Sequence, residues 1–121
     1  MPNPGALIKS YRAEEAIPGR AIVKFGTSGG VVVARITADL AIGIADQLDA
    51  AVGDVVDVIM SGSAEVKLLT TVAAGQPVRG GTDGAARPAV PGAGNVAVGF
   101  ALADGVAGDI IDVVLARHSV T

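Results

Sequence analysis

Cysteine and tryptophan are absent from this sequence, and aromatic residues of any kind are scarce. Without cysteine the chain can form no disulfide, no thiolate metal site and no cysteine nucleophile, which agrees with a reducing compartment. Tyr11, Phe25 and Phe100 are the whole aromatic stock, so no aromatic platform for stacking sugars is expected. The core must therefore be built from Val, Ile, Leu and Ala, which bury less area than aromatic rings. Such a chain is a candidate for gaining further burial by oligomerising.

A basic cluster and a membrane-spanning run are also missing. The 9 basic residues are spread along the chain against 12 acidic ones, so nucleic acid is not an expected partner. No stretch approaches the roughly 20 apolar residues of a membrane span, and the basic-then-apolar layout of a signal peptide is absent. We therefore expect a soluble protein that is made in the cytoplasm.

The most informative feature that is present is an internal repeat. Residues 19–60 can be laid over residues 75–115 at a shift of 55 or 56 positions, with conservative apolar exchanges between matching turn residues. This pattern predicts one supersecondary unit, duplicated and fused, with units at about 17–60 and 73–115. The matched turn residues are Gly29 with Gly84, Gly53 with Gly108, and Asp54 with Asp109.

The fold class follows from the repeat. Gly-rich turns separate short runs of β-branched residues, which is typical of strands joined by tight hairpins. One more strand is expected between the units, so we predict an all-β fold of about eight or nine short strands, a compact β-barrel or sandwich. The predicted strands are 20–25, 31–34, 40–45 and the run after Asp54 in the first unit, 64–70 between the units, and 76–80, 85–90, 96–102 and the run after Asp109 in the second.

Residues 37–52 also match a helical pattern. Leu40, Ile44 and Leu48 recur at helical spacing, and Thr37 could cap a helix. The corresponding stretch of the second unit is rich in glycine, which weakens a helix. We therefore expect at most one helical turn, near residues 46–51.

The turn residues are interpreted as structural. Gly29 and Gly84 are predicted to have positive φ angles in equivalent hairpins, where alanine would cost on the order of 1 kcal/mol or more. Asp54 and Asp109 follow glycine at a strand entrance, where aspartate usually bonds its own backbone. Residues three apart in a strand face opposite sides, so neither aspartate shares a metal or proton with the aspartate that follows it.

No catalytic, cofactor-binding or metal-binding residue is predicted. His118 is the only histidine, and a triad would need a distant carboxylate and Ser119 as its nucleophile. Residues 80–84 lack the Lys-Ser/Thr of a phosphate loop and precede a Pro-containing strand. Because convergent polar groups are missing, we do not expect an enzyme or a bound cofactor.

Residues 1–12 precede the repeat and are predicted to form an extended arm, with residues 13–121 as a single β domain. Pro2-Asn3-Pro4-Gly5 keep the start from folding on itself, so the arm could lie along another chain and add backbone hydrogen bonds there. A frayed terminus, or one more strand of the chain's own barrel, would explain the same residues. These alternatives remain open at the level of sequence.

Four segments of the chain, at residues 22–26, 42–46, 53–66 and 74–78, form a characteristic combination of motifs. Together they resemble the small capsid cement or head decoration proteins of tailed bacteriophages. The similarity extends from about Leu7 to Leu115, over turn-and-strand patterns without a catalytic signature. The resemblance implies a virion protein, made in the host bacterial cytoplasm, that assembles as trimers on the outer surface of the icosahedral head and clamps neighbouring major capsid subunits.

The capsid or subunit contacts do not follow from these motifs. We expect them at the two ends of the chain, where apolar, aromatic and basic residues occur together. The candidate interface residues are Leu7, Ile8, Lys9, Tyr11, Arg12, Arg117 and His118.

Two other classes of function share features with this sequence. A duplicated all-β fold also describes biotinyl and lipoyl carrier domains, but these present a modifiable Lys beside Met at a hairpin tip. Here Met60 is followed by Ser61-Gly62, and neither Lys24 nor Lys67 has a Met neighbour. A small hydrolytic enzyme is disfavoured further, because no nucleophile and base stand out.

Overall fold

The computed structural model describes residues 7–36, 38–92 and 94–120, and within these ranges the chain forms ten strands and one short 3-10 turn. In the same ranges no helix is long and apolar enough to cross a membrane. The first sheet contains β1 (Ile8–Arg12), β2 (Ile22–Phe25), β3 (Val31–Val33), β4 (Ala41–Ala45) and β5 (Val55–Ile59). The second contains β6 (Ser63–Lys67), β7 (Pro77–Gly80), β8 (Ala86–Pro88), β9 (Val96–Ala101) and β10 (Ile110–Ser119), with η1 (Thr82–Gly84) between β7 and β8.

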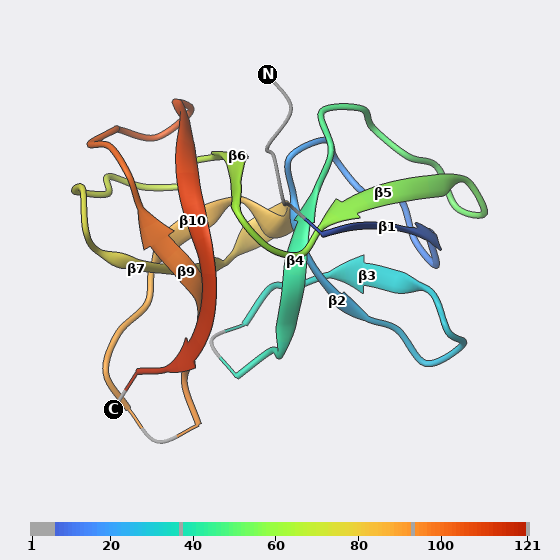
Figure 1. Cartoon of the computed structure of the whole chain (residues 1–121), viewed down its shortest axis with the longest axis horizontal. Helices are drawn as coiled ribbons and strands as arrows, with labels where there is room; N and C mark the ends of the chain where they lie inside the picture. Colours follow the sequence, from blue (N-terminus) through green and yellow to red (C-terminus); the bar gives the residue numbers. More distant parts are fainter. Residues whose placement is uncertain (1–6, 37, 93, 121) are drawn as a thin grey trace.

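The two sheets share one topology. Their strand orders are β1-β5-β4-β2-β3 and β6-β10-β9-β7-β8, and all neighbouring strands run antiparallel. We call residues 8–59 the first unit and residues 63–119 the second unit. Figure 1 shows the first unit on the right and the second on the left, with β4 near the centre. The predicted all-β architecture of two similar units is therefore confirmed.

The Gly-Asp turns are equivalent in detail. The carboxylate Oδ2 of Asp54 accepts a hydrogen bond from the amide of Ala51 at 3.0 Å, and Oδ2 of Asp109 accepts one from the amide of Val106 at 2.9 Å. Each aspartate thus closes its own turn at a strand entrance, as its position after glycine predicted. The predicted turn glycines with positive φ are Gly29, Gly53, Gly84 and Gly108.

The prediction of an extended arm is wrong for residues 8–12, because they form an edge strand of the chain's own first sheet. β1 pairs with β5 from Ile8 opposite Ile59 to Arg12 opposite Val55. The physical reason is that successive side chains of a strand point to opposite faces of the sheet, which turns the Tyr11 ring inward, onto the core of the first unit. β1 is also the counterpart of β6, so the repeat begins earlier than residue 17. Residues 1–6, with the Pro-Gly start, lie outside the described residues.

The single helical turn predicted near residues 46–51 is absent, and the segment is an irregular loop. Ala50 exchanges two backbone hydrogen bonds with Ile17, at 2.8 and 2.9 Å, in a short antiparallel bridge. Of the apparent helical stripe only Ile44 is buried, while Leu40 and Leu48 are 62% and 73% exposed, so the three side chains do not share one face. The proposed cap, Thr37, lies outside the described residues.

The core is aliphatic, as the shortage of aromatic residues predicted. One cluster belongs wholly to the first unit, and a second cluster belongs to the second unit but also takes in side chains from the first sheet. The side chains of Ile22 and Ile44 extend from the first sheet into this second cluster and are fully buried. The residues that the first unit contributes to the shared cluster are Ile22, Ala34, Ala41 and Ile44.

Two glycines of the second unit lie in the seam between the units. A Cβ atom at Gly80 would overlap the carbonyl oxygen of Ala34. At Gly84, which has a φ of +75°, a Cβ would lie 2.7 Å from the Cβ of Ala21 and 2.9 Å from Cγ1 of Val33. The β7–β8 hairpin can therefore approach the first sheet only because these positions carry no side chain.

The hairpin of the first unit is organised differently, around a carboxylate. Glu14 accepts hydrogen bonds from the backbone amides of Gly30 at 2.6 Å and of Thr27 and Ser28, both at 3.2 Å. Leu69 occupies the equivalent position in the second unit. The Gly-rich loop at residues 26–30 is thus an anion nest that the chain fills with its own side chain.

The seam predicts unequal costs for two equivalent substitutions. Both Gly29→Ala and Gly84→Ala place alanine at a positive φ, which costs about 1 kcal/mol or more. Gly29 has open space around its Cα, whereas Gly84 has the contacts just described, so Gly84→Ala should cost roughly 1–3 kcal/mol more through overpacking. Urea unfolding of both variants measures the difference. Equal midpoints would contradict the close packing of this hairpin.

The carboxylate nest predicts a local effect. Removing the Glu14 carboxylate by Glu14→Ala leaves the amides of residues 27, 28 and 30 to water and should cost about 1–2 kcal/mol. Amide exchange of these residues should become faster, while exchange in the β7–β8 hairpin stays unchanged and serves as the internal control. Glu14→Gln, which keeps one acceptor oxygen, should give an intermediate result. Unaltered exchange in Glu14→Ala would refute the nest.

Candidate functional site

The candidate interface residues of β1 divide between the surface and the chain's own core. Leu7 and Ile8 are 47% and 52% exposed, and Lys9 is exposed as well. Tyr11 is half-buried: its ring meets Phe25 edge to face at 5.6 Å, and its hydroxyl donates to the sulfur of Met60 at 3.8 Å. The side chain of Tyr11, one of the candidate interface residues, therefore packs within the first unit.

Arg12 also has an internal contact, since its Nη1 donates to the carbonyl oxygen of Gly53 at 3.1 Å. Arg117 and His118 lie far along β10, in the other sheet. His118 stacks on Phe100 with ring centroids 4.7 Å apart and an interplanar angle of 16°. The structure thus places the candidate residues in two different sheets, so they do not form one surface.

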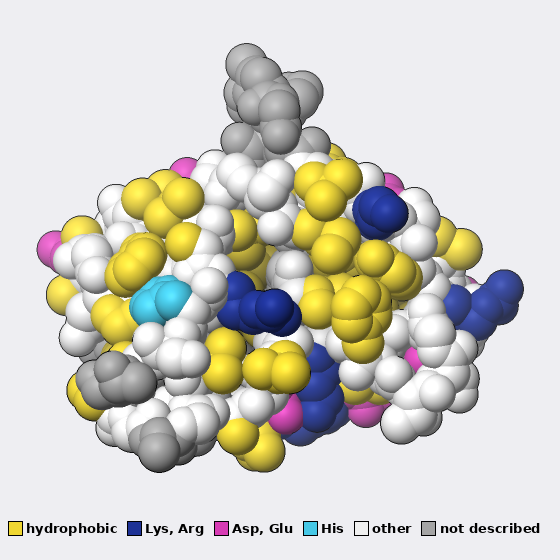
Figure 2. All heavy atoms as spheres, turned by 60° about the horizontal axis from the view of Figure 1, so that its bottom comes forward, with side chains coloured by type: hydrophobic (Ala, Val, Ile, Leu, Met, Phe, Trp, Pro, Cys, Tyr) yellow, Lys and Arg dark blue, Asp and Glu magenta, His cyan; other side chains and the backbone are white. Residues whose placement is uncertain are grey.

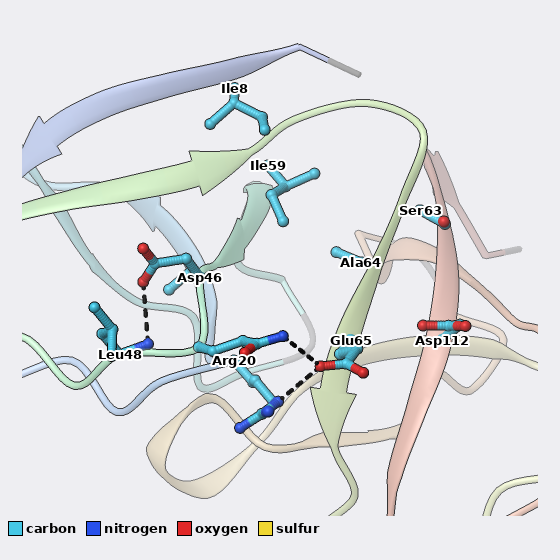
Figure 3. Close-up of a pocket in the computed structure, with 11 residues that line it drawn as sticks. Ile8, Arg20, Asp46, Leu48, Ile59, Ser63, Ala64, Glu65 and Asp112 are labelled. Carbon is cyan, nitrogen blue, oxygen red and sulfur yellow. Dashed lines mark hydrogen bonds and ion pairs between the residues drawn. The ribbon is translucent and has the colours of Figure 1, made fainter. Parts of the chain in front are cut away.

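A groove runs between the two units (Figure 3). Ile8, Ile59 and Leu48 supply apolar walls, and Glu65 on β6 projects into the groove. Nε of Arg20 lies 3.1 Å from Oε1 of Glu65, and the same oxygen accepts a hydrogen bond from Gln47 at 3.0 Å. The charge of Arg20 is therefore neutralised within the chain. The contacts of Arg20 and Gln47 with Glu65 hold the two units together and leave these polar groups engaged.

One edge strand of each sheet, β3 in the first and β8 in the second, is blocked. At the β3 edge the amide of Val33 donates to Oε2 of Glu15 at 2.8 Å. Arg35 lies 2.8 Å from the same oxygen, and its hydrogen bond holds the pKa of Glu15 below the ordinary value. At the equivalent position of β8 stands Pro88, which has no amide hydrogen. Both edges are thereby protected from pairing with another chain.

The residues required by a carrier domain are not arranged as such a domain needs them. Nζ of Lys24 lies 2.8 Å from Oδ1 of Asp39. Lys67 is the last residue of strand β6 and pairs with Ile110. Neither lysine is presented at a hairpin tip beside methionine, so the structure does not favour the carrier alternative. Within residues 7–36, 38–92 and 94–120, no three His, Cys, Asp or Glu side chains gather closely enough to hold a metal ion.

Sequence reasoning missed one pairing of charges. The basic residues look scattered along the chain, but the β7–β8 hairpin places Arg79 directly opposite Arg87. The signal was available in the turn at residues 81–84, because a hairpin centred there brings positions 79 and 87 together.

Comparison with known proteins gives a consistent result. Among solved structures, the chain is similar to the head fiber gp8.5 N base of bacteriophage phi29, with a TM-score of 0.70 and 16% sequence identity over 92% of this chain and 94% of that chain. At this identity the likeness shows a shared fold. No curated protein sequence matches the chain. A family model described as "Phage cement protein" matches residues 3–118. Because the match spans nearly the whole chain, the protein belongs to the phage cement protein family, a family of structural phage proteins.

Proposed function

We propose that this chain binds the outer surface of an icosahedral phage head as a homotrimer and stabilises the contacts between neighbouring major capsid subunits. The observation that carries the proposal is the family match over residues 3–118. The fold shared with a phage head fiber base supports it. The role needs no turnover, only repeated contacts on a symmetric lattice, where several linked copies bind far more tightly than one.

The surface is suited to such contacts. Large apolar side chains are exposed in both units, and Figure 2 shows hydrophobic patches over the face that it presents. Val55 and Ile110 begin the equivalent strands β5 and β10 and are 67% and 48% exposed. Contiguous exposed apolar area on a small domain is typical of a surface that meets other proteins. The most exposed large apolar residues are Leu48, Val52, Val55, Leu40 and Ile36.

The direct experiment is co-sedimentation of the purified protein with expanded heads that lack it. We expect saturable binding at a fixed number of copies per head. Decorated heads should also resist heat, or low-salt buffer without a chelator, better than bare heads do. Unexpanded heads serve as the control for a surface that forms on expansion. Absence from the pellet at saturating protein would contradict capsid binding.

The oligomeric state is measured separately, by sedimentation velocity of the free protein over a range of concentrations. A trimer is the species that the resemblance to cement proteins implies, and the exposed apolar surface of the chain is one that association can cover. A monomer at all concentrations, combined with binding to heads, would refute the trimer while leaving capsid binding intact.

A further inference from the structure

The outer face of the second sheet carries two arginines side by side. Arg79 on β7 and Arg87 on β8 are cross-strand partners, so both side chains project from the same face. Their neighbours Gly80 and Ala86 form the next pair and are buried on the opposite face. Two like charges directly opposite each other destabilise a sheet unless a counter-charge is near.

The first unit shows how the same position is neutralised when the charge is structural. Lys24 is the counterpart of Arg79, and its Nζ lies 2.8 Å from Oδ1 of Asp39. In the second unit the residue at the Asp39 position is Asn95, since each donates its backbone amide to the carbonyl oxygen three residues earlier, and the neutral side chain of Asn95 bonds the carbonyl oxygen of Val90 instead of a cation. The residue opposite Lys24 is Val32, whereas Arg79 faces a second arginine. Compared with the first unit, the second unit therefore has one carboxylate fewer and one guanidinium group more at this place.

The hydrogen bonds of the two guanidinium groups leave donors unused. Nη1 of Arg79 donates to the carbonyl oxygens of Gly80 at 2.8 Å and Arg35 at 3.4 Å, while its Nε is buried without a partner. Arg87 is exposed and has no hydrogen bond or ion pair to any residue that the structure describes. Burial and the charge of Arg87 both lower the pKa of Arg79 from its ordinary value. The pair is an uncompensated positive site on a chain whose net charge is −3.

An apolar shelf adjoins the arginines on the same face. Pro77 alternates with Arg79 along β7 and pairs with Phe100, which pairs with Val114. His118 stacks on Phe100 at the end of this row. All four side chains are half-buried. Figure 2 shows the single histidine, in cyan, among hydrophobic side chains with a basic group close by.

The repeat indicates that this shelf lacks a cover. Pro77 and Phe100 are the counterparts of Ile22 and Ile44, which the second unit buries completely. The face that is an internal interface in the first unit is thus open in the second. A surface that combines an apolar shelf with unpaired arginines is typical of a protein-binding site.

The chain itself offers few carboxylates to this face. Within the described residues, every aspartate and glutamate except Asp83 and Asp112 already accepts a hydrogen bond or forms an ion pair. Asp83 lies in the turn of the β7–β8 hairpin, whereas Asp112 on β10 pairs with Glu65 and lines the groove between the units. Among the described residues, a second copy of the chain therefore has only two isolated, exposed carboxylates without a partner and no acidic cluster to set against the arginine pair.

We propose that the outer face of the second sheet, centred on Arg79 and Arg87, binds an acidic surface segment of the major capsid protein, whose Asp or Glu carboxylate lies between the two guanidinium groups. The proposal rests on the proposed function. It identifies the contact as a charge-assisted one, in which arginine can hold a carboxylate through two parallel hydrogen bonds. The half-buried row from Pro77 to His118 supplies the apolar part of the contact.

The test uses expanded heads lacking the protein and the variant Arg87→Gln, which removes a charge that makes no internal contact. We expect about tenfold weaker binding and a flatter dependence on NaCl than for the unaltered protein. Lys67→Gln is the matched control, because it removes one exposed charge from β6, at the opposite edge of the same sheet. Thermal melting of both variants checks the fold. Arg87→Gln binding as tightly as Lys67→Gln would overturn the inference.

A second variant identifies the partner chemically. Arg87→Lys keeps the charge and introduces an amine that a carbodiimide couples to a carboxylate in direct contact. Sequencing the coupled peptides should return an acidic segment of the major capsid protein. Coupling only to another copy of this chain would overturn the proposal and assign the face to the oligomer. If the unaltered protein fails to bind heads, the proposed function fails too, whereas its binding together with an unaffected Arg87→Gln refutes only this inference.

Discussion

The close approach of the β7–β8 hairpin to the first sheet is the contact on which the rest of the structure depends. A chain with almost no aromatic side chains must obtain its burial from many small aliphatic ones, which requires short distances between layers. Gly80 and Gly84 allow that distance, because neither puts a Cβ against Ala34 or Ala21. Through this seam Ile22 and Ile44 enter the core of the second unit, so that this core is built from both sheets while the first unit keeps a further core of its own.

The seam also makes two equal units unequal. Each unit has the same strand order and the same Gly-Asp turns, but one face of the first sheet is covered by its neighbour while the matching face of the second sheet is not. Residues at matching positions differ accordingly: Ile22 and Ile44 are buried aliphatics, whereas Pro77 and Phe100 are half-buried beside two arginines. Duplication thus supplies both a stable body and a face that is free to bind a partner.

The sequence permitted a prediction of the turns and most strands, because turn glycines and Gly-Asp pairs depend on local backbone conformation. The segment of β1 contains none of these markers, so the sequence alone does not reveal that it occupies the place of β6 in the repeat. The sequence does not exclude a helical turn before residue 52, because the bridge between Ile17 and Ala50 that takes its place is a tertiary contact. The Arg79–Arg87 pair depends on hairpin register, and its missing counter-charge becomes visible only when Asp39 is seen bound to Lys24.

The central claim is that the open face of the second sheet meets the capsid. The most direct measurement is a cryo-EM reconstruction of expanded heads decorated with the protein, at a resolution that separates the two sheets. The account predicts density for the chain outside the shell, with β7, β8 and β9 toward the major capsid protein and the first-unit hairpin at residues 26–30 away from it. Contact made instead through the first-unit hairpin or β1, with Arg87 facing solvent, would contradict it.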